Sequence, residues 1–245
     1  MLETAQLTIT LQRRYNYSRF HRITEISAIC LFGVCAAGLA WKLAGTLDSA
    51  ASWGALVVAV VLAPFAADFV SGFVHWMADR YGAETTPLLG NNFIRPFREH
   101  HANPDEISRH DFVETNGSNC IVAAPCMTIA FFALPASTDL FLSTFFLGSA
   151  LAFGLTIFGT NQFHKWAHMN NVPRLARALQ RAGVILGPEH HADHHVAPFG
   201  KNYCITGGWW NPVLSRLLFF ERVEMLIELL TGARTAESRE TPYGS

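Results

Sequence analysis

Charged side chains are scarce in this sequence of 245 residues. Asp, Glu, Lys and Arg together make up 15% of the chain, whereas a soluble domain carries about 25%. Half of the residues are hydrophobic, which excludes a disordered chain. The 18 basic and 19 acidic residues nearly cancel, which argues against nucleic acid as a partner. The composition provides too few polar groups to cover the surface of an ordinary soluble domain.

Cysteine pairs of the metal-binding or redox kind are also missing. The five cysteines form no C-x-x-C pair, and four of them lie in apolar runs, as small buried hydrophobic side chains do. This usage fits a reducing compartment. No flavin, haem or iron–sulfur motif is present either, so any electrons that the protein uses come from an external donor.

Long apolar runs, by contrast, are plentiful. A helix that crosses the hydrocarbon core of a bilayer needs about 20 mainly apolar residues. Four stretches qualify, at residues 23–43, 49–67 continuing toward 77, 114–139 and 140–160. We therefore predict an all-α integral membrane bundle of about four transmembrane helices. A cleaved signal peptide is the alternative for the first stretch, but the leader before it is too long.

The basic residues predict the orientation of this bundle. All of them except Lys42 fall on one side of the four spans, and Lys and Arg collect on the cytoplasmic side of a membrane. Both termini are therefore expected in the cytoplasm, in a multi-pass protein of a bacterial inner membrane. Residues 1–22 form a cytoplasmic segment, 23–231 the membrane domain and 232–245 a flexible tail. Amphipathic patterns at 172–186 and 213–230 predict helices that lie in the interface.

Histidine is the abundant polar residue, and ten of the 11 histidines fall in two windows on the cytoplasmic side. The first holds His75, His100, His101 and His110, and the second holds His164, His168, His190, His191, His194 and His195. The remaining one, His21, is interpreted as an interface anchor. Because the second and fourth spans end on the same side, the two windows can converge.

The spacing within the windows is that of ligands on helices. His164 and His168 are four residues apart, and the H-x-x-H-H run at 191–195 is expected to place three imidazoles on one helical face. Asp68, His75 and Asp79 share one stripe of the second span. A metal-bound imidazole needs an acceptor for its second N–H. The candidate acceptors are Asp79, Glu99, Asp111, Glu189 and Asp193.

The number of histidines implies two metal ions, because a zinc site uses three or four protein ligands. Imidazole suits iron, copper, zinc and nickel alike. Iron is favoured, since a lipid chain is the obvious substrate in a membrane and its unactivated C–H bonds require O₂ and a redox metal. A metal or haem transporter would place imidazoles inside the spans. A membrane zinc hydrolase and simple solvated polar faces also compete with this interpretation.

Four segments carry a family resemblance. HWMADRYG, REHHANPDEISRHDFVETNG, NQFHKWAH and PEHHADHHVAPFGKNYCITGGWWN resemble the Kua-type lipid desaturases, over about residues 60–215. That family includes plasmanylethanolamine desaturases and plastid acyl-lipid desaturases. The resemblance implies a membrane-embedded, O₂-dependent di-iron enzyme. Its metal ligands would be His75, His100, His101, His164, His168, His191, His194 and His195.

The resemblance leaves several residue roles open. Asp79, His110, Asn161 and His190 are assigned to catalysis. Asp79 either binds metal or orients His75, and His110 either joins the site or forms a structural hydrogen bond. The wider acyl-CoA desaturases would have a histidine at Phe97; we expect His75 with Asp79 to substitute. Arg95, Arg98 and Lys201 either contact a lipid phosphate or only contribute positive charge.

The expected reaction introduces a vinyl-ether double bond next to the ether oxygen of a plasmanyl phospholipid, plasmanylethanolamine in the first place, to form plasmalogen. Metal ligands at the cytoplasmic ends of two spans would lie near head-group depth, within reach of carbons close to the glycerol. An acyl-lipid desaturase or hydroxylase that acts near the carbonyl is the alternative. The expected cofactors are two Fe ions, with O₂ as co-substrate. The expected partners are a membrane phospholipid and a ferredoxin-like or cytochrome-like electron-transfer protein, with no nucleic acid.

Overall fold

The structure is a computed structural model that describes residues 18–83, 85, 86, 90, 94–134 and 139–236. Within these residues all regular secondary structure is helical. Most of the 1–22 segment and of the 232–245 tail lies outside the described residues.

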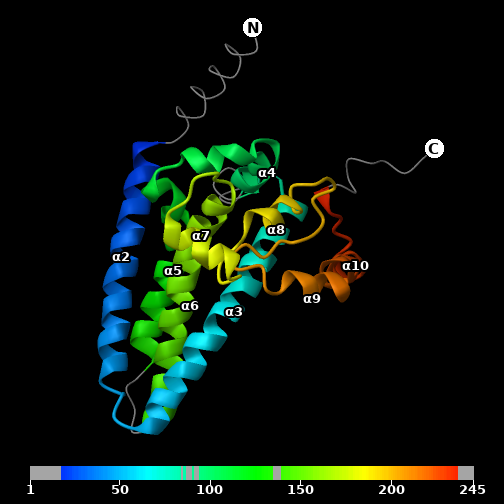
Figure 1. Ribbon diagram of the computed structural model, residues 1–245. Helices are drawn as coiled ribbons and strands as arrows, with labels where there is room; N and C mark the ends of the chain where they lie inside the picture. Colours follow the sequence, from blue (N-terminus) through cyan, green and yellow to red (C-terminus); the bar gives the residue numbers. More distant parts are fainter. Residues whose placement is uncertain (1–17, 84, 87–89, 91–93, 135–138, 237–245) are drawn as a thin grey trace, which may run out of the picture.

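Four long helices lie side by side and form the body of the molecule (Figure 1). Each is long and apolar enough to cross a membrane. They are α2 (Arg19–Ala44), α3 (Ala50–Arg80), α5 (Phe112–Ala133) and α6 (Leu140–Ala167). This confirms the predicted all-α membrane bundle, although α3 and α6 continue well beyond their apolar stretches to carry polar residues at one end.

Side-chain caps mark where all four of these helices begin, and at α2 the Ser18 hydroxyl accepts from the backbone N–H of His21. Ser49 and Ser52 form a capping box at the start of α3, and Asp111 with Glu114 forms another at the start of α5. At α6 the Asp139 carboxylate accepts from the backbone N–H of Leu142. Such caps satisfy N–H groups that the first turn leaves unpaired.

Small residues let the long helices approach closely. Helix α2 packs against α5, α3 against α6, and α5 against α6. At the α3–α6 contact a Cβ on Gly148 would lie only 3.2 Å from the Cβ of Ala59. Close backbone approach through small residues is the usual way in which membrane helices associate. Large apolar side chains such as Val57, Val61 and Leu62 point outward instead, as expected of a surface that faces lipid.

The chain begins α2 and α5, and ends α3 and α6, at one end of the bundle, which we call the histidine-bearing end (Figure 1). The short helices collect there or beside α3. They are α4 (Arg95–Ala102), η2 (Pro104–Arg109), α7 (Arg174–Arg181), α8 (Pro188–Ala192), α9 (Asn211–Arg216) and α10 (Phe219–Thr231).

The two predicted interfacial helices differ from the observed ones. The 172–186 pattern yields only α7, which ends shortly before Gly183, a residue with φ of 67°. The single helix predicted over 213–230 is wrong, because α9 and α10 are separate and Leu218 between them has φ of 47°. This break turns the chain so that Phe220 packs against Trp76 and Tyr203.

Candidate metal centre

Four helices and the turn after the last of them bring the predicted ligands together at the histidine-bearing end. The last two turns of α3 carry His75 and Asp79, and α4 carries His100 and His101. His164 lies in the last turn of α6, and His168 is its C-cap residue. His191 lies in α8, and His194 and His195 follow directly after it. These nine residues form two groups that could each hold a metal ion.

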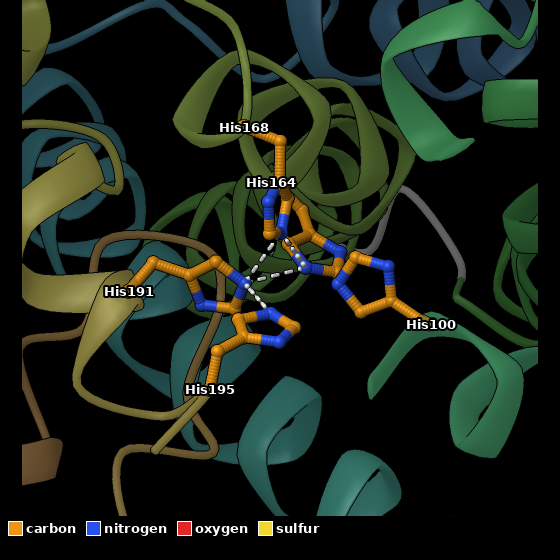
Figure 2. Close-up of side chains that lie close together, drawn as sticks. All are labelled: His100, His164, His168, His191 and His195. Atoms are coloured by element: carbon orange, nitrogen blue, oxygen red, sulfur yellow. Dashed lines mark hydrogen bonds between the residues drawn. The ribbon is translucent and has the colours of Figure 1, made fainter. Parts of the chain in front are cut away.

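The first group consists of five histidines, which point toward one another in Figure 2. The Nε2 atom of His191 lies 2.8 Å from those of His164 and His168, and 3.0 Å from that of His195. The ring of His100 completes the group, with centroids 4.6 Å from His164 and His168. We call these residues the five-histidine group.

These contacts are too many to be ordinary hydrogen bonds. One imidazole nitrogen either donates one proton or offers one lone pair in the ring plane, so His191 Nε2 cannot bond to three neighbours at once. A metal–nitrogen bond of about 2.1 Å puts two ligands at right angles about 3.0 Å apart. The observed spacing is therefore that of ligands around one ion.

The second group consists of His75, Asp79, His101 and His194, and we call it the His75/Asp79 group. The Oδ2 atom of Asp79 lies 3.4, 3.6 and 3.8 Å from the Nε2 atoms of His75, His101 and His194. The Nε2 atoms of His101 and His194 are 2.8 Å apart. Both carboxylate oxygens are buried and have no hydrogen-bond partner within the described part of the chain.

Backbone carbonyls fix two histidines of this group. The Nδ1 atom of His75 lies 3.1 Å from the carbonyl oxygen of Tyr203, and that of His194 lies 2.7 Å from the carbonyl oxygen of Lys201. Because a carbonyl only accepts, both Nδ1 atoms must carry the proton, which leaves an Nε2 lone pair on each ring. These lone pairs face the Asp79 carboxylate, an arrangement that a metal cation, or a proton, between them would stabilise. Asp79 thus lies on the ligand side of His75 and does not act as its N–H acceptor.

Burial keeps the histidines neutral, which is the form that binds metal. Loss of hydration, with a smaller contribution from His195, lowers the pKa of His101 to about 4 and of His168 to about 3. The pKa of His194 is about 3 for the same main reason, although its bond to the Lys201 carbonyl opposes the shift. At neutral pH each of these rings therefore offers a lone pair.

The other predicted acceptors lie elsewhere. Glu99 accepts from Arg95 at 2.7 Å, and Asp111 caps α5 and pairs with Arg22 at 2.8 Å. Asp193 lies 3.9 Å from Lys201 Nζ, and Glu189 is exposed. Asp68, on the same stripe as His75, accepts from the backbone N–H groups of Gly207, Gly208 and Trp210. The acceptors observed in the structure are instead the backbone carbonyls of Tyr203 and Lys201, and no sequence motif marks them.

The prediction that the H-x-x-H-H run presents one helical face is wrong. Helix α8 ends at Ala192, and the next turns are tighter, with His194 N–H bonded to the His191 carbonyl at 2.9 Å. The three rings stay close, with centroids 4.7 to 5.6 Å apart, but they divide between the two groups. His191 and His195 enter the five-histidine group, whereas His194 enters the His75/Asp79 group.

Three residues assigned to catalysis lie outside both groups. The carbonyl of His110 accepts from Lys165 Nζ, and Asn161 Nδ2 donates to Ser118 Oγ at 3.2 Å. His190 Nε2 accepts from Asn211 Nδ2 at 2.8 Å. Their catalytic roles stay predictions. Phe97, where the wider desaturases would have a histidine, packs against His75 with ring centroids 5.1 Å apart.

Comparisons with known proteins agree with this site. A family model described as a lipid desaturase domain matches residues 64–238. Plasmanylethanolamine desaturase of Myxococcus xanthus is 46% identical over 216 residues, which cover 88% of this chain and 75% of the relative. Plasmanylethanolamine desaturase 1 of Mus musculus is 45% identical over 183 residues, covering 73% and 67%.

A plant relative is more distant. The chloroplastic fatty acid desaturase 4 of Arabidopsis thaliana is 38% identical over 170 residues, covering 69% of this chain and 50% of the relative. No solved structure matches the chain. The family match includes every residue of both metal groups. The protein therefore belongs to the lipid desaturase family, as its histidine motifs predict, and is a multi-pass membrane oxidoreductase.

Proposed function

We propose that this protein is an O₂-dependent di-iron desaturase that converts a plasmanyl phospholipid, in the first place plasmanylethanolamine, into the corresponding plasmalogen. The observation that carries the proposal is the pair of adjoining metal groups, built from eight histidines and Asp79. The two relatives named plasmanylethanolamine desaturase, at 46% and 45% identity, support the substrate.

The reaction removes one hydrogen from each of the two chain carbons next to the ether oxygen and forms a double bond between them. Reduction of O₂ to two water molecules takes four electrons and four protons. The substrate supplies two of each. A ferredoxin-like or cytochrome-like protein supplies the other two electrons, and solvent supplies two protons. Two bound iron ions would supply the activation of O₂ and the transfer of electrons.

The residues present fit such ions. The five-histidine group offers only neutral nitrogen donors, whereas the His75/Asp79 group adds one carboxylate whose oxygens are buried and unpartnered within the described residues. Aromatic rings enclose the second group: Phe97 packs on His75, and Phe199 stacks on His101 with centroids 4.7 Å apart. This apolar wall keeps water away from the ligands and so protects a reactive site from side reactions.

The position of the site supports a reaction close to the lipid head group. The ligands lie in the last turns of α3 and α6 and not at mid-helix. A carbon near the glycerol reaches this level, whereas a double bond in mid-chain would require a long tunnel. We place this end, and both termini, in the cytoplasm of a bacterial cell, because the basic residues collect there.

The basic residues proposed for head-group contact have partners within the protein. Arg95 pairs with Glu99 at 2.7 Å. One guanidinium nitrogen of Arg98 donates to the carbonyls of Tyr81 and Gly82, both at 3.2 Å. Lys201 is the most exposed of the three and lies 3.9 Å from Asp193. We therefore assign any phosphate contact to Lys201 and a structural role to Arg98.

An acyl-lipid desaturase or hydroxylase is the second candidate. Desaturation and hydroxylation begin with the same hydrogen abstraction, so the same ligands would serve both. Within this second candidate, the 38% identical relative named fatty acid desaturase 4 favours desaturation over hydroxylation.

Expression in a host that lacks vinyl ethers, fed an alkylglycerol, separates the two candidates by mass spectrometry of the lipids. A plasmanyl desaturase yields ether lipids that release a fatty aldehyde in mild acid. An acyl-lipid desaturase yields an acid-stable unsaturated acyl chain instead, and this result would contradict the proposal. A His164→Ala variant, which removes one member of the five-histidine group, serves as the inactive control.

A further inference from the structure

A buried stretch without helical structure lies behind the His75/Asp79 group. The stretch runs from Tyr203 to Trp210 and enters α9 at Asn211, and we call it, with Asn211 included, the 203–211 loop. The loop packs against α3 at the level of Asp68 and Ser71. At 1.5 Å per residue, Asp68 is about 18 Å along the helix from Arg80. Irregular backbone inside an apolar bundle needs internal partners for its N–H and C=O groups.

Asp68 supplies three of these partners. Its Oδ1 atom accepts from the N–H groups of Gly207 and Gly208, both at 2.9 Å, and its Oδ2 atom accepts from that of Trp210 at 3.2 Å. The side chain is fully buried. One carboxylate thus satisfies three backbone donors of the loop.

Further contacts hold the beginning of the loop. Asn211 accepts from the N–H of Cys204 at 2.8 Å and donates to its carbonyl at 3.0 Å. Ser71 Oγ accepts from the N–H of Ile205 at 3.2 Å. The loop approaches α3 so closely that a Cβ on Gly72 would collide with Cys204 Sγ and lie 3.0 Å from its nitrogen. Cys204 is therefore fixed from both sides.

The residue before Cys204 makes the contact that matters for the metal site. The Tyr203 carbonyl lies 3.1 Å from His75 Nδ1 and fixes the tautomer in which Nε2 faces Asp79. The Tyr203 ring is buried against His194, with centroids 5.2 Å apart. A shift of the loop would thus move both the carbonyl and this ring.

We propose that Asp68 is a positioning residue, which acts through the 203–211 loop to set the direction of the Tyr203 carbonyl and so the tautomer and ring orientation of His75. The inference rests on the metal centre of the proposed function. Asp68 is not itself a ligand, because its oxygens bind backbone N–H groups and it lies outside both metal groups. Residues that orient a metal-bound histidine typically change metal affinity or activity by about 10- to 100-fold.

The test measures metal content and the His75 tautomer in the full-length protein. Asp68→Ala should weaken one of two metal sites by about 10- to 100-fold, so that metal content falls from two ions per chain toward one during dialysis. Asp68→Asn keeps an acceptor for the two glycine N–H groups but places an amide near Trp210 N, so its loss should be smaller. Combined with His75→Ala, Asp68→Ala should add no further loss. In a protein that has already lost the ion of the five-histidine group through His195→Ala, Asp68→Ala should remove the ion of the His75/Asp79 group as well.

A control variant separates positioning from general loss of stability. Thr144 is buried at the other end of the bundle, where its hydroxyl lies 2.7 Å from Thr46 Oγ1. Thr144→Val should lower the melting temperature and leave the metal content unchanged. If Asp68→Ala does not fold, as judged by helical circular dichroism, the same metal content and His75 tautomer are measured in Asp68→Asn and Ser71→Ala instead.

A measurement on the metal-free protein keeps this inference distinct from the proposed function. In protein labelled with ¹⁵N-histidine, the His75 signals, assigned by their absence in His75→Gln, should report a protonated Nδ1 in the parent and a mixture of tautomers in folded Asp68→Ala. An unchanged tautomer together with unchanged metal affinity would overturn the positioning role of Asp68. A parent that binds no metal but shows the tautomer shift would overturn the metal centre and support the role of Asp68 in orienting His75.

Discussion

The Oδ2 atom of Asp79 lies 3.4 Å from the Nε2 atom of His75, one turn earlier on α3. His75 donates its Nδ1 proton to the Tyr203 carbonyl, so the nitrogen that faces Asp79 carries a lone pair. Two electron-rich groups held this close in a buried site repel each other unless a metal cation or a proton lies between them. This relationship makes Asp79 a ligand candidate equal to the histidines, and it leads to the first of the predictions that follow.

Asp79→Asn should deplete metal as severely as His75→Ala does, because both substitutions remove a donor that faces the same ion. Glu99→Gln is the matched control, since Glu99 lies outside both groups and pairs with Arg95. Elemental analysis of the purified variants provides the comparison. An Asp79→Asn protein that keeps both ions and loses only activity would assign Asp79 to orientation or proton transfer instead.

The purified parent protein should contain close to two metal ions per chain, mainly iron, after expression in iron-replete medium. The reason is that nine donor residues divide into two separate groups, whereas one zinc site needs four ligands at most. Elemental analysis with protein quantified by amino-acid analysis provides the ratio. One zinc ion per chain without iron would contradict the di-iron proposal.

The adjacent histidines His190 and His191 should behave differently. His191→Ala should abolish turnover and empty the five-histidine group, because its Nε2 atom lies within 3.0 Å of three other members. His190→Ala should keep both ions. It removes the acceptor of Asn211 Nδ2, and loss of such a partner costs about 1–3 kcal/mol of folding stability.

Metal content and thermal unfolding provide the comparison between these two variants. Loss of metal in His190→Ala to the same extent as in His191→Ala would show that His190 belongs to the site. A His191→Ala protein that still turns over substrate would contradict the assignment of the five-histidine group.

The metal-free protein should lose stability as the pH falls below about 6.5, the ordinary pKa of histidine in an unfolded chain. Burial holds the pKa of folded His101 at about 4 and of His194 at about 3. Between these values and 6.5 the unfolded state binds more protons, so stability is fully present above 6.5 and declines below it. Chemical unfolding in detergent at several pH values measures this slope.

Removal of one of these imidazoles tests whether the buried histidines cause the loss of stability at low pH. His101→Gln should reduce the dependence of stability on pH, because one buried neutral imidazole is gone. A slope that is unchanged in this variant would assign the acid sensitivity to other groups.

The two ends of the bundle should face opposite sides of the membrane. Reporter fusions after Leu43 and after Ser245 should give opposite signals, because the α2–α3 connection lies away from the histidine-bearing end (Figure 1). A periplasmic reporter active only after Leu43 supports the proposed orientation. Equal signals from both fusions would contradict a four-span topology.

The sequence alone is sufficient to predict the four long helices and most of the candidate ligands. Runs without charge predict all four spans because burial of apolar surface depends on composition and length, which are local properties. His164 and His168, four residues apart, can be recognised as neighbours on a helix for the same reason. The eight histidines predicted as ligands all lie in the two groups, together with Asp79.

Only the tertiary structure decides how these ligands are divided and oriented. His194 and His195 are adjacent in sequence but enter different groups, because neighbouring side chains leave a turn in different directions, and here one meets ligands from α3 and the other meets ligands from the end of α6. The Tyr203 carbonyl that orients His75 comes from 128 residues away, and every residue has such a carbonyl, so no side-chain pattern can mark it. In the sequence, Asp68 is a charge in an apolar span that shares a stripe with His75 and Asp79, and nothing in the pattern indicates its partners. Its partners are backbone N–H groups about 140 residues away, and this pairing exists only once α3 and the 203–211 loop have packed together.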